Sequence, residues 1–206
     1  RGNHSADNEE AAFLLGGDLV NQMTPTNFAA RELAIPFIGL FSACATSVSS
    51  VIVASLLTEI GAANFSIAGA SSQHNAVERQ FRYPINYGAQ KPQTAQWTVT
   101  AAGYALIGKH QEDAPCIEAA TVGKVIDYGM DDPFHMGAAM APAAFQTIKA
   151  HLEDRKQEIY HYDLILTGDL GQLGLKLLKG MLVESGIKNE ELTLLRDAGA
   201  EFYGQD

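Results

Sequence analysis

The sequence has few cysteines and no cluster of basic residues, and both scarcities narrow its function. Only two cysteines, Cys44 and Cys116, occur in 206 residues, too few for the disulfide framework of a small secreted domain. The formal net charge is −10. Because a nucleic-acid-binding face needs concentrated lysine and arginine, and no such tract occurs, we expect no nucleic-acid partner.

The sequence also lacks an uninterrupted apolar run of transmembrane length. The stretch from Leu33 to Thr58 carries no charged residue and is long enough to cross a bilayer. However, Pro36 and Gly39 interrupt it, and serine and threonine recur along it. A strand, a turn and a buried helix explain this composition better, so we predict no membrane span. We recognise no signal peptide, and we interpret the start at Arg1 as a fragment boundary or a processed end.

The residues present are sufficient for a core, with 47% hydrophobic and 18% charged. The most informative stretch is an apolar strand from Phe37 that enters a small-residue turn. The following segment, Val48 to Ile60, has no polar face, which predicts a helix buried on all sides. Cys44 then lies at the amino end of this helix, where free N–H groups and the helix dipole lower the pKa of a thiol or attract carboxylates. The alternative is that Cys44 is simply a small buried residue.

Strands and helices alternate over the first part of the chain. We predict strands at Ala12–Gly16, Phe37–Phe41 and Phe65–Gly69, and helices at Thr24–Leu33 and Val48–Ile60. This βαβαβ order favours a parallel sheet covered by helices, in which ligands bind beyond the carboxyl ends of the strands. The turns that carry Asp18, Cys44 and His74 each follow a strand, so we expect them at one edge of the sheet.

Residues 78–92 form the most cationic and aromatic stretch of this acidic chain, with Arg79, Arg82, Tyr83, Tyr87 and Lys91. These side chains either anchor a solvated loop or cover a pocket for an anion. Further on, the composition predicts two antiparallel strands and then an amphipathic helix. These elements are Thr94–Ile107, Cys116–Ile126 and Pro142–Leu152.

A short repeat follows. Leu164–Leu170 resembles Phe13–Leu19, since each is an apolar strand that ends in Gly-Asp-Leu before a helix, which is consistent with duplication. The second helix is predicted at Leu173–Glu184, with Gly186 as its C-cap. We therefore predict a first half at 1–160, with a poorly ordered start at 1–12 and the cationic loop at 78–92. The start of a second half occupies 161–206.

Several motifs resemble known proteins. Phe41–Ser47 is similar to the nucleophile turn of the thiolase fold, which thiolases and ketoacyl synthases share. Gly17–Gln22, Ser71–Pro84 and Ala138–Ala144 more narrowly resemble the stage V sporulation protein AD family of spore-forming bacteria. This resemblance implies a thiolase-like α/β fold that binds dipicolinic acid without acting as a thiolase. It also implies a role in dipicolinate uptake into the spore and release at germination.

The family resemblance further implies a place at the spore inner membrane, beside integral membrane proteins of the same operon. It implies a homodimer joined through the strand near Phe65–Gly69. The expected ligand is a flat aromatic dianion, which needs N–H donors at a helix terminus, a bidentate arginine and a flat apolar wall. We predict as ligand-binding residues Cys44, Thr46, Ser47, His74, Asn75, Arg79 and Arg82. No metal site or cofactor is expected, and calcium would enter only as a chelate with dipicolinate.

Two other functions stay open. In the first, the chain is an acyl-CoA condensing or thiolytic enzyme that uses Cys44 as its nucleophile. No histidine matches a thiolase catalytic motif, and His74 is alternatively a structural hydrogen-bonding residue. In the second, the chain is a structural subunit that docks to a membrane complex and binds no small molecule.

Overall fold

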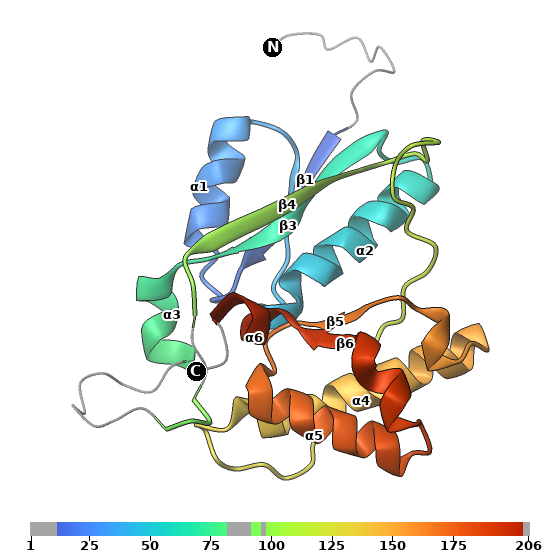
Figure 1. Cartoon of the computed structure of the whole chain (residues 1–206). Coiled ribbons are helices and arrows are strands. Elements are labelled where there is room, and N and C mark those ends of the chain that lie inside the picture. Colours follow the sequence, from blue (N-terminus) through green and yellow to red (C-terminus); the bar gives the residue numbers. More distant parts are fainter. Residues whose placement is uncertain (1–11, 82–91, 96–97, 204–206) are drawn as a thin grey trace, which may run out of the picture. The chain divides into compact units, whose positions relative to one another are not determined.

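The computed structural model describes residues 12–81, 92–95 and 98–203 (Figure 1). The chain forms two compact units, one of Arg1–Gln80 with Thr98–Ala120 and one of Phe81–Trp97 with Thr121–Asp206. This division follows the packing of the chain, and it is independent of the predicted duplication. The halves at 1–160 and 161–206 therefore stay a prediction. The predicted disordered start and most of the cationic loop lie outside the described residues.

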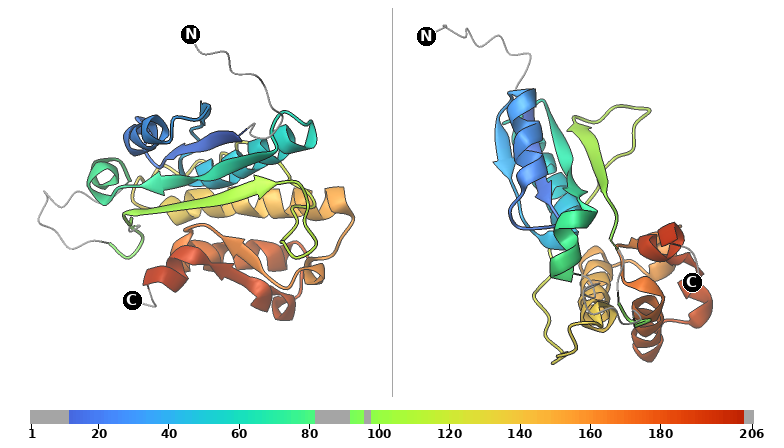
Figure 2. Two further views of the ribbon diagram at one scale, coloured as in Figure 1. Left: turned by 90° about the horizontal axis from the view of Figure 1, so that it is seen from above. Right: turned by 90° about the vertical axis from the view of Figure 1, so that its left-hand side faces the viewer.

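The first unit contains a four-stranded sheet in the order β2-β1-β3-β4. Its strands are β1 (Ala12–Asp18), β2 (Phe37–Gly39), β3 (Phe65–Ser72) and β4 (Ala101–Gly108), and its helices are α1 (Thr24–Leu33), α2 (Thr46–Glu59) and α3 (His74–Phe81). β1 is parallel to β2 and β3, whereas β4 is antiparallel to β3. Helices α1 and α2 pack on opposite faces of the sheet (Figure 2). This arrangement confirms the predicted βαβαβ order.

Helix α2 packs on the sheet through its small residues. Thr46, Ser50 and Ala54 are buried, and Ser50 Oγ donates to Gly69 O over 3.1 Å, which requires a close approach of helix and strand. Val51, Val53 and Leu57 pack, partly buried, against the same core. On the other side of the helix Val48 and Leu56 are 61% and 57% exposed, and Ile60, just after the helix, is 73% exposed. The prediction of a helix buried on all sides is therefore wrong, because only one side of α2 faces the sheet and the apolar side chains on its other side are exposed.

Strand β3 lies inside the sheet. Phe65 to Gly69 pairs with β1 on one side and with β4 on the other, so both rows of backbone groups are already hydrogen-bonded. A second copy therefore cannot add a strand to β3, and the predicted dimer contact near Phe65–Gly69 stays a prediction that needs contacts other than strand pairing. The outer strands of the described sheet are β2 and β4.

The predicted strand at Cys116–Ile126 is also wrong, because this segment has no regular secondary structure. Its Val, Ile and Thr content favours a strand, but β-propensity stabilises a strand only against a neighbouring strand. Val122 and Val125 are 81% and 100% exposed. Only β4, at Ala101–Gly108, forms from the predicted pair.

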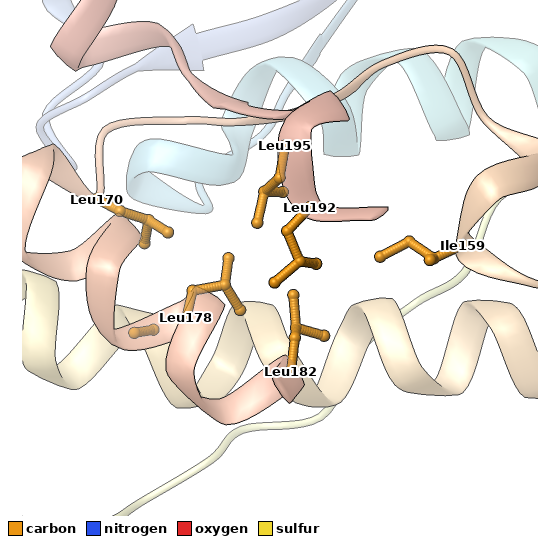
Figure 3. Packing of buried hydrophobic residues seen from close by; sticks show 7 residues of the cluster. Ile159, Leu170, Leu178, Leu182, Leu192 and Leu195 are labelled. Atoms are coloured by element: carbon orange, nitrogen blue, oxygen red, sulfur yellow. The ribbon is translucent and has the colours of Figure 1, made fainter. Parts of the chain in front are cut away.

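The second unit is built on two helices, α4 (Met136–Arg155) and α5 (Gly171–Glu184). A parallel pair of short strands, β5 (Ile165–Thr167) and β6 (Leu195–Asp197), and helix α6 (Ala198–Tyr203) complete it. Figure 3 shows Leu178 and Leu182 of α5 directed toward Leu192 and Leu195. Ile159, Leu170 and Ala141 also belong to this buried cluster.

The register of the two strand pairs agrees with the predicted duplication. Leu14 pairs with Phe37 and Gly16 with Gly39. At the matching positions of the repeat, Ile165 pairs with Leu195 and Thr167 with Asp197. Helices α1 and α5 also end at matching positions of the repeat, at Leu33 and Glu184. The repeat therefore extends from seven residues of sequence to a strand, a helix and a second parallel strand.

Candidate functional site

The predicted site begins at the turn between β2 and α2. A short 3₁₀ helix, Ala43–Ala45, carries Cys44 directly before α2 begins at Thr46. The position predicted for Cys44 at the amino end of this helix is confirmed, and its side chain is exposed. Ala43 has φ +46°, a left-handed conformation that is strained for a residue with a side chain. The turn is therefore held in a sharp geometry that presents Cys44 at the surface.

Thr46 holds this turn in place. Its Oγ1 accepts from Ser42 N over 3.0 Å and donates to Ala43 O over 2.8 Å, and the residue is 0% exposed. The sequence predicts a ligand contact for Thr46, but its hydroxyl already accepts one hydrogen bond and donates another within the turn, and no solvent reaches it. We correct that prediction, because Thr46 shapes the turn. Ser47 is exposed beside it.

Asp18 connects β1, α1 and β3 by hydrogen bonds. Its carboxylate accepts from Thr26 N over 3.3 Å, from Thr26 Oγ1 over 2.9 Å and from the Ser71 hydroxyl. Only 1% of the residue is exposed. Asp18 thus supplies an acceptor to the first turn of α1, whose N–H groups lack helical partners, and it links β1 to β3. Its role at this edge is to hold the scaffold.

The strand register brings the predicted turns to one edge. Asp18 at the end of β1 is level with Ser71 near the end of β3, and Gly16 is level with Gly39 at the end of β2. The Cys44 turn and helix α3, which begins at His74, each follow one of these strand ends. The prediction that the three turns share an edge is therefore confirmed.

His74 is anchored at that edge. Its backbone N donates to Thr100 Oγ1 over 2.9 Å, and its Nδ1 lies 3.3 Å from Thr98 O. Both contacts come from the segment that enters β4, so the structural interpretation of His74 has direct support. Asn75 follows and is exposed. The backbone of Arg79 belongs to α3, but its side chain, and Arg82 altogether, lie outside the described residues, so the bidentate arginine stays a prediction.

Sequence reasoning missed Tyr104. This residue pairs with Gly69 across the sheet, and Gly69 is level with Gly16. A Cβ at Gly16 would lie 3.1 Å from Tyr104 Cε1, and one at Gly69 would lie 2.7 Å from Tyr104 Cδ1, so the ring occupies the space that a side chain at either glycine would need. Its hydroxyl is 3.4 Å from Thr26 Oγ1. The only signal in the sequence is glycine in two apolar strands, which marks a close approach without naming the partner.

Metal-ligating side chains do not gather into a site in the described part of the chain, where no three His, Cys, Asp or Glu residues come together. Across residues 12–81, 92–95 and 98–203, no helix combines the length and apolar content needed to span a bilayer.

Comparisons with known proteins agree with this geometry. The profile of the family described as "Stage V sporulation protein AD" matches residues 2–206. The chain belongs to this family. It is 49% identical over 178 residues to the stage V sporulation protein AD of Bacillus subtilis (strain 168), an alignment that covers 86% of this chain and 52% of that protein. The chain thus spans about half the length of its curated relative.

Solved structures show the same fold at low identity. The tetronic acid condensing enzyme AbyA1 matches with a TM-score of 0.57 and 16% identity, over 92% of this chain and 63% of that chain. The 3-oxoacyl-[acyl-carrier-protein] synthase III from Aquifex aeolicus VF5 matches with a TM-score of 0.56 and 8% identity, over 91% of this chain and 61% of that chain. These likenesses establish a thiolase-like α/β fold. They carry no activity to this chain.

Proposed function

We propose that this sporulation protein binds dipicolinic acid at the sheet edge that carries the Cys44 turn. The observation that supports it best is the exposed amino end of α2, at the same edge as α3 with His74 and Arg79. Backbone N–H groups and the helix dipole at such an end favour a carboxylate. Cys44 and Ser47 border the ligand in this arrangement.

The second carboxylate of the ligand needs its own cation, because the chain has a formal net charge of −10 that repels a dianion at long range. We assign this role to Arg79, whose planar guanidinium matches a carboxylate bidentately. His74 and Asn75 complete the rim next to α3. Calcium enters this proposal only as the ion that dipicolinate itself chelates.

Titration calorimetry with dipicolinate, with and without calcium, tests the proposal. Arg79→Ala should weaken binding by about 1.5–3 kcal/mol, as for a hydrogen bond to a charged group. Arg31→Ala is the matched control in the same unit, since Arg31 pairs with Glu32 and is 67% exposed, and it should leave the affinity unchanged. Equal affinity in all three proteins would remove Arg79 from the site. An absence of heat with wild-type protein, confirmed by equilibrium dialysis, would favour a purely structural subunit.

The role in the spore is part of the same proposal. We place the protein at the spore inner membrane, where it supports dipicolinate uptake and release together with integral membrane proteins of its operon. The support is the family membership. A homodimer also stays part of the proposal, and the outer strands β2 and β4 are the edges open to it in the described sheet.

An acyl-CoA condensing or thiolytic enzyme is the second candidate. The exposed Cys44 at the amino end of α2 favours it, because such a position stabilises a thiolate. Iodoacetamide labelling at neutral pH separates the candidates, with the exposed Cys116 as the internal control. A nucleophile should label Cys44 much faster than Cys116 and turn over acetyl-CoA. A binding protein should show neither, and its Cys44→Ala variant should keep most of its dipicolinate affinity.

A further inference from the structure

The second unit contains a cavity of about 280 Å³ that the proposed function does not use. Helix α4, strand β5 with the residues before it, and the segment that begins at Thr121 form its walls. Its apolar lining consists of Ile148, Leu152, Leu164 and Ile165, and its polar lining consists of Thr121, Thr147, His151 and Tyr162. Asp, Glu, Lys and Arg side chains are absent from the described lining, so the cavity carries no fixed charge of its own.

A chain of hydrogen bonds determines which polar groups of the cavity donate and which accept. His151 Nδ1 lies 2.8 Å from Thr121 Oγ1, and His151 Nε2 lies 2.8 Å from the Tyr162 hydroxyl. The Tyr162 hydroxyl donates its proton to Gln157 Oε1 over 2.7 Å. Because that proton is already used, His151 must donate through Nε2, and its Nδ1 then accepts the proton of Thr121.

The orientation of the Gln157 amide fits this assignment. Its Nε2 lies 3.0 Å from Nε2 of His161, where an amide N–H can donate to an unprotonated ring nitrogen. The ring of Tyr162 is the other group against His161, at 5.1 Å between ring centroids.

Thr147 completes the pattern, because its Oγ1 donates to Ala143 O over 2.9 Å. Every hydroxyl proton on the polar wall is therefore directed to a protein acceptor. The oxygens of Thr121, Thr147 and Tyr162 keep lone pairs, since a hydroxyl oxygen accepts two hydrogen bonds. The hydroxyl groups of the cavity thus offer hydrogen-bond acceptors beside an apolar floor.

We propose that this cavity is a binding site for a small uncharged molecule with one ring-sized apolar body and a hydrogen-bond donor, of the phenol or alcohol class. An anion such as a carboxylate is disfavoured, because it brings only acceptors to hydroxyl groups that offer acceptors and meets no lysine or arginine in the described lining. The cavity lies in a different compact unit from the Cys44 turn. The inference therefore stands independently of dipicolinate binding.

Three probes of one shape test the inference on the whole chain: p-cresol, its methyl ether 4-methylanisole, and 4-methylbenzoate. Titrations followed by the methyl NMR signals of Ile148, Leu152, Leu164 and Ile165 should show saturable p-cresol binding. The affinity for p-cresol should exceed that for the ether by about fivefold, the contribution of one hydrogen bond. The benzoate should leave these signals unchanged.

Two variants locate the effect. Thr121→Val removes an acceptor at nearly constant shape, so the preference for p-cresol over the ether should fall severalfold. Thr193→Val is its control, because Thr193 is an exposed threonine outside the cavity. Ile148→Trp fills the cavity and should abolish binding of all three probes while circular dichroism stays native.

Equal affinities for p-cresol and 4-methylanisole would overturn the inference, because the polar wall would then contribute nothing. Shifts that persist in Ile148→Trp, or that spread outside the cavity, would show adventitious hydrophobic binding only and overturn it as well. Preferential binding of the benzoate would contradict the assignment of these hydroxyl groups as acceptors.

Discussion

The two strand pairs of the repeat share one register, yet the leucine in the middle of the first strand is buried in one pair and exposed in the other. Leu15 in β1 and Leu166 in β5 occupy matching positions of the duplication. Leu15 is 0% exposed and packs with Ala54 of α2 and Ala68 of β3, whereas Leu166 is 55% exposed. In the first repeat, α2 follows the second strand and packs against Leu15. In the second repeat, the described element after β6 is the short helix α6. The sequence of a strand and its pairing therefore do not determine whether its leucine is buried.

The buried acids show a second divergence. Asp18 ends the first strand of its repeat and caps α1. In the other repeat the buried acid is Asp197, at the end of the second strand, which accepts from Leu170 N over 2.8 Å and Gly171 N over 3.2 Å. Asp169, the sequence counterpart of Asp18, lies instead against Gly199, where an added Cβ would overlap its Oδ1. A helix start needs an acceptor, and either strand end can supply it.

The largest expected loss of stability comes from replacing the buried leucine, and the exposed leucine provides the comparison. Leu15→Ala should lower the free energy of unfolding of the first unit by about 3 kcal/mol, because it leaves a cavity under α2. Leu166→Ala should cost less than about 1 kcal/mol, since the side chain is half in solvent. Denaturant unfolding measures both, and hydrogen exchange assigns each loss to its unit. Equal losses would mean that Leu166 is covered in solution.

Replacing the two buried acids, Asp18 and Asp197, should lower the free energy of unfolding by smaller amounts that are similar to each other. Asp18→Ala and Asp197→Ala each leave several buried donors without an acceptor, at a cost of about 2–3 kcal/mol. Asp197→Ala should expose the first-turn amides of α5 to hydrogen exchange, and Asp18→Ala should do so for α1. If Asp169→Ala instead gave the larger loss at α5, the capping role would follow the sequence repeat and contradict the observed contacts.

Much of the fold could be predicted because its signals are local. Thr24-Pro25 marks the start of α1, which begins at Thr24, and the Gly-Asp-Leu repeat marks the duplication. Helix α4 differs from the prediction for an equally local reason. The sequence pattern predicts the helix start at Pro142, but α4 begins at Met136, and the His135 side chain accepts from Ala138 N over 3.3 Å. Histidine is not among the usual N-cap residues.

The site was less predictable because its contacts are not local. The edge shared by the Cys44 and His74 turns follows from strand order, which the sequence indicates. The position of Tyr104 depends on the register of β3 with β4, and no sequence pattern fixes that register. A threonine at position 46 is compatible with ligand binding and with closing a turn, so the sequence alone does not separate these roles. Only its two hydrogen bonds distinguish these roles.

The smallest expected effects come from two glycines, one in each unit. Both have room for a side chain, but their backbone conformations differ. A Cβ at Gly61 or at Gly180 would meet no atom within 4 Å. Gly61 follows α2 with φ +74°, so Gly61→Ala should destabilise the first unit by about 1 kcal/mol. Gly180 lies inside α5, so Gly180→Ala should stabilise the second unit by about 1 kcal/mol through helix propensity.

Denaturant unfolding of the two alanine variants should therefore give shifts of opposite sign. Gly61→Asn is the control at the first position, because asparagine tolerates a positive φ better than alanine does, and it should recover part of the loss. Shifts of the same sign would show that a side chain contacts one of these sites in solution. Opposite signs would show that backbone conformation alone separates the two sites, just as coverage alone separates Leu15 from Leu166.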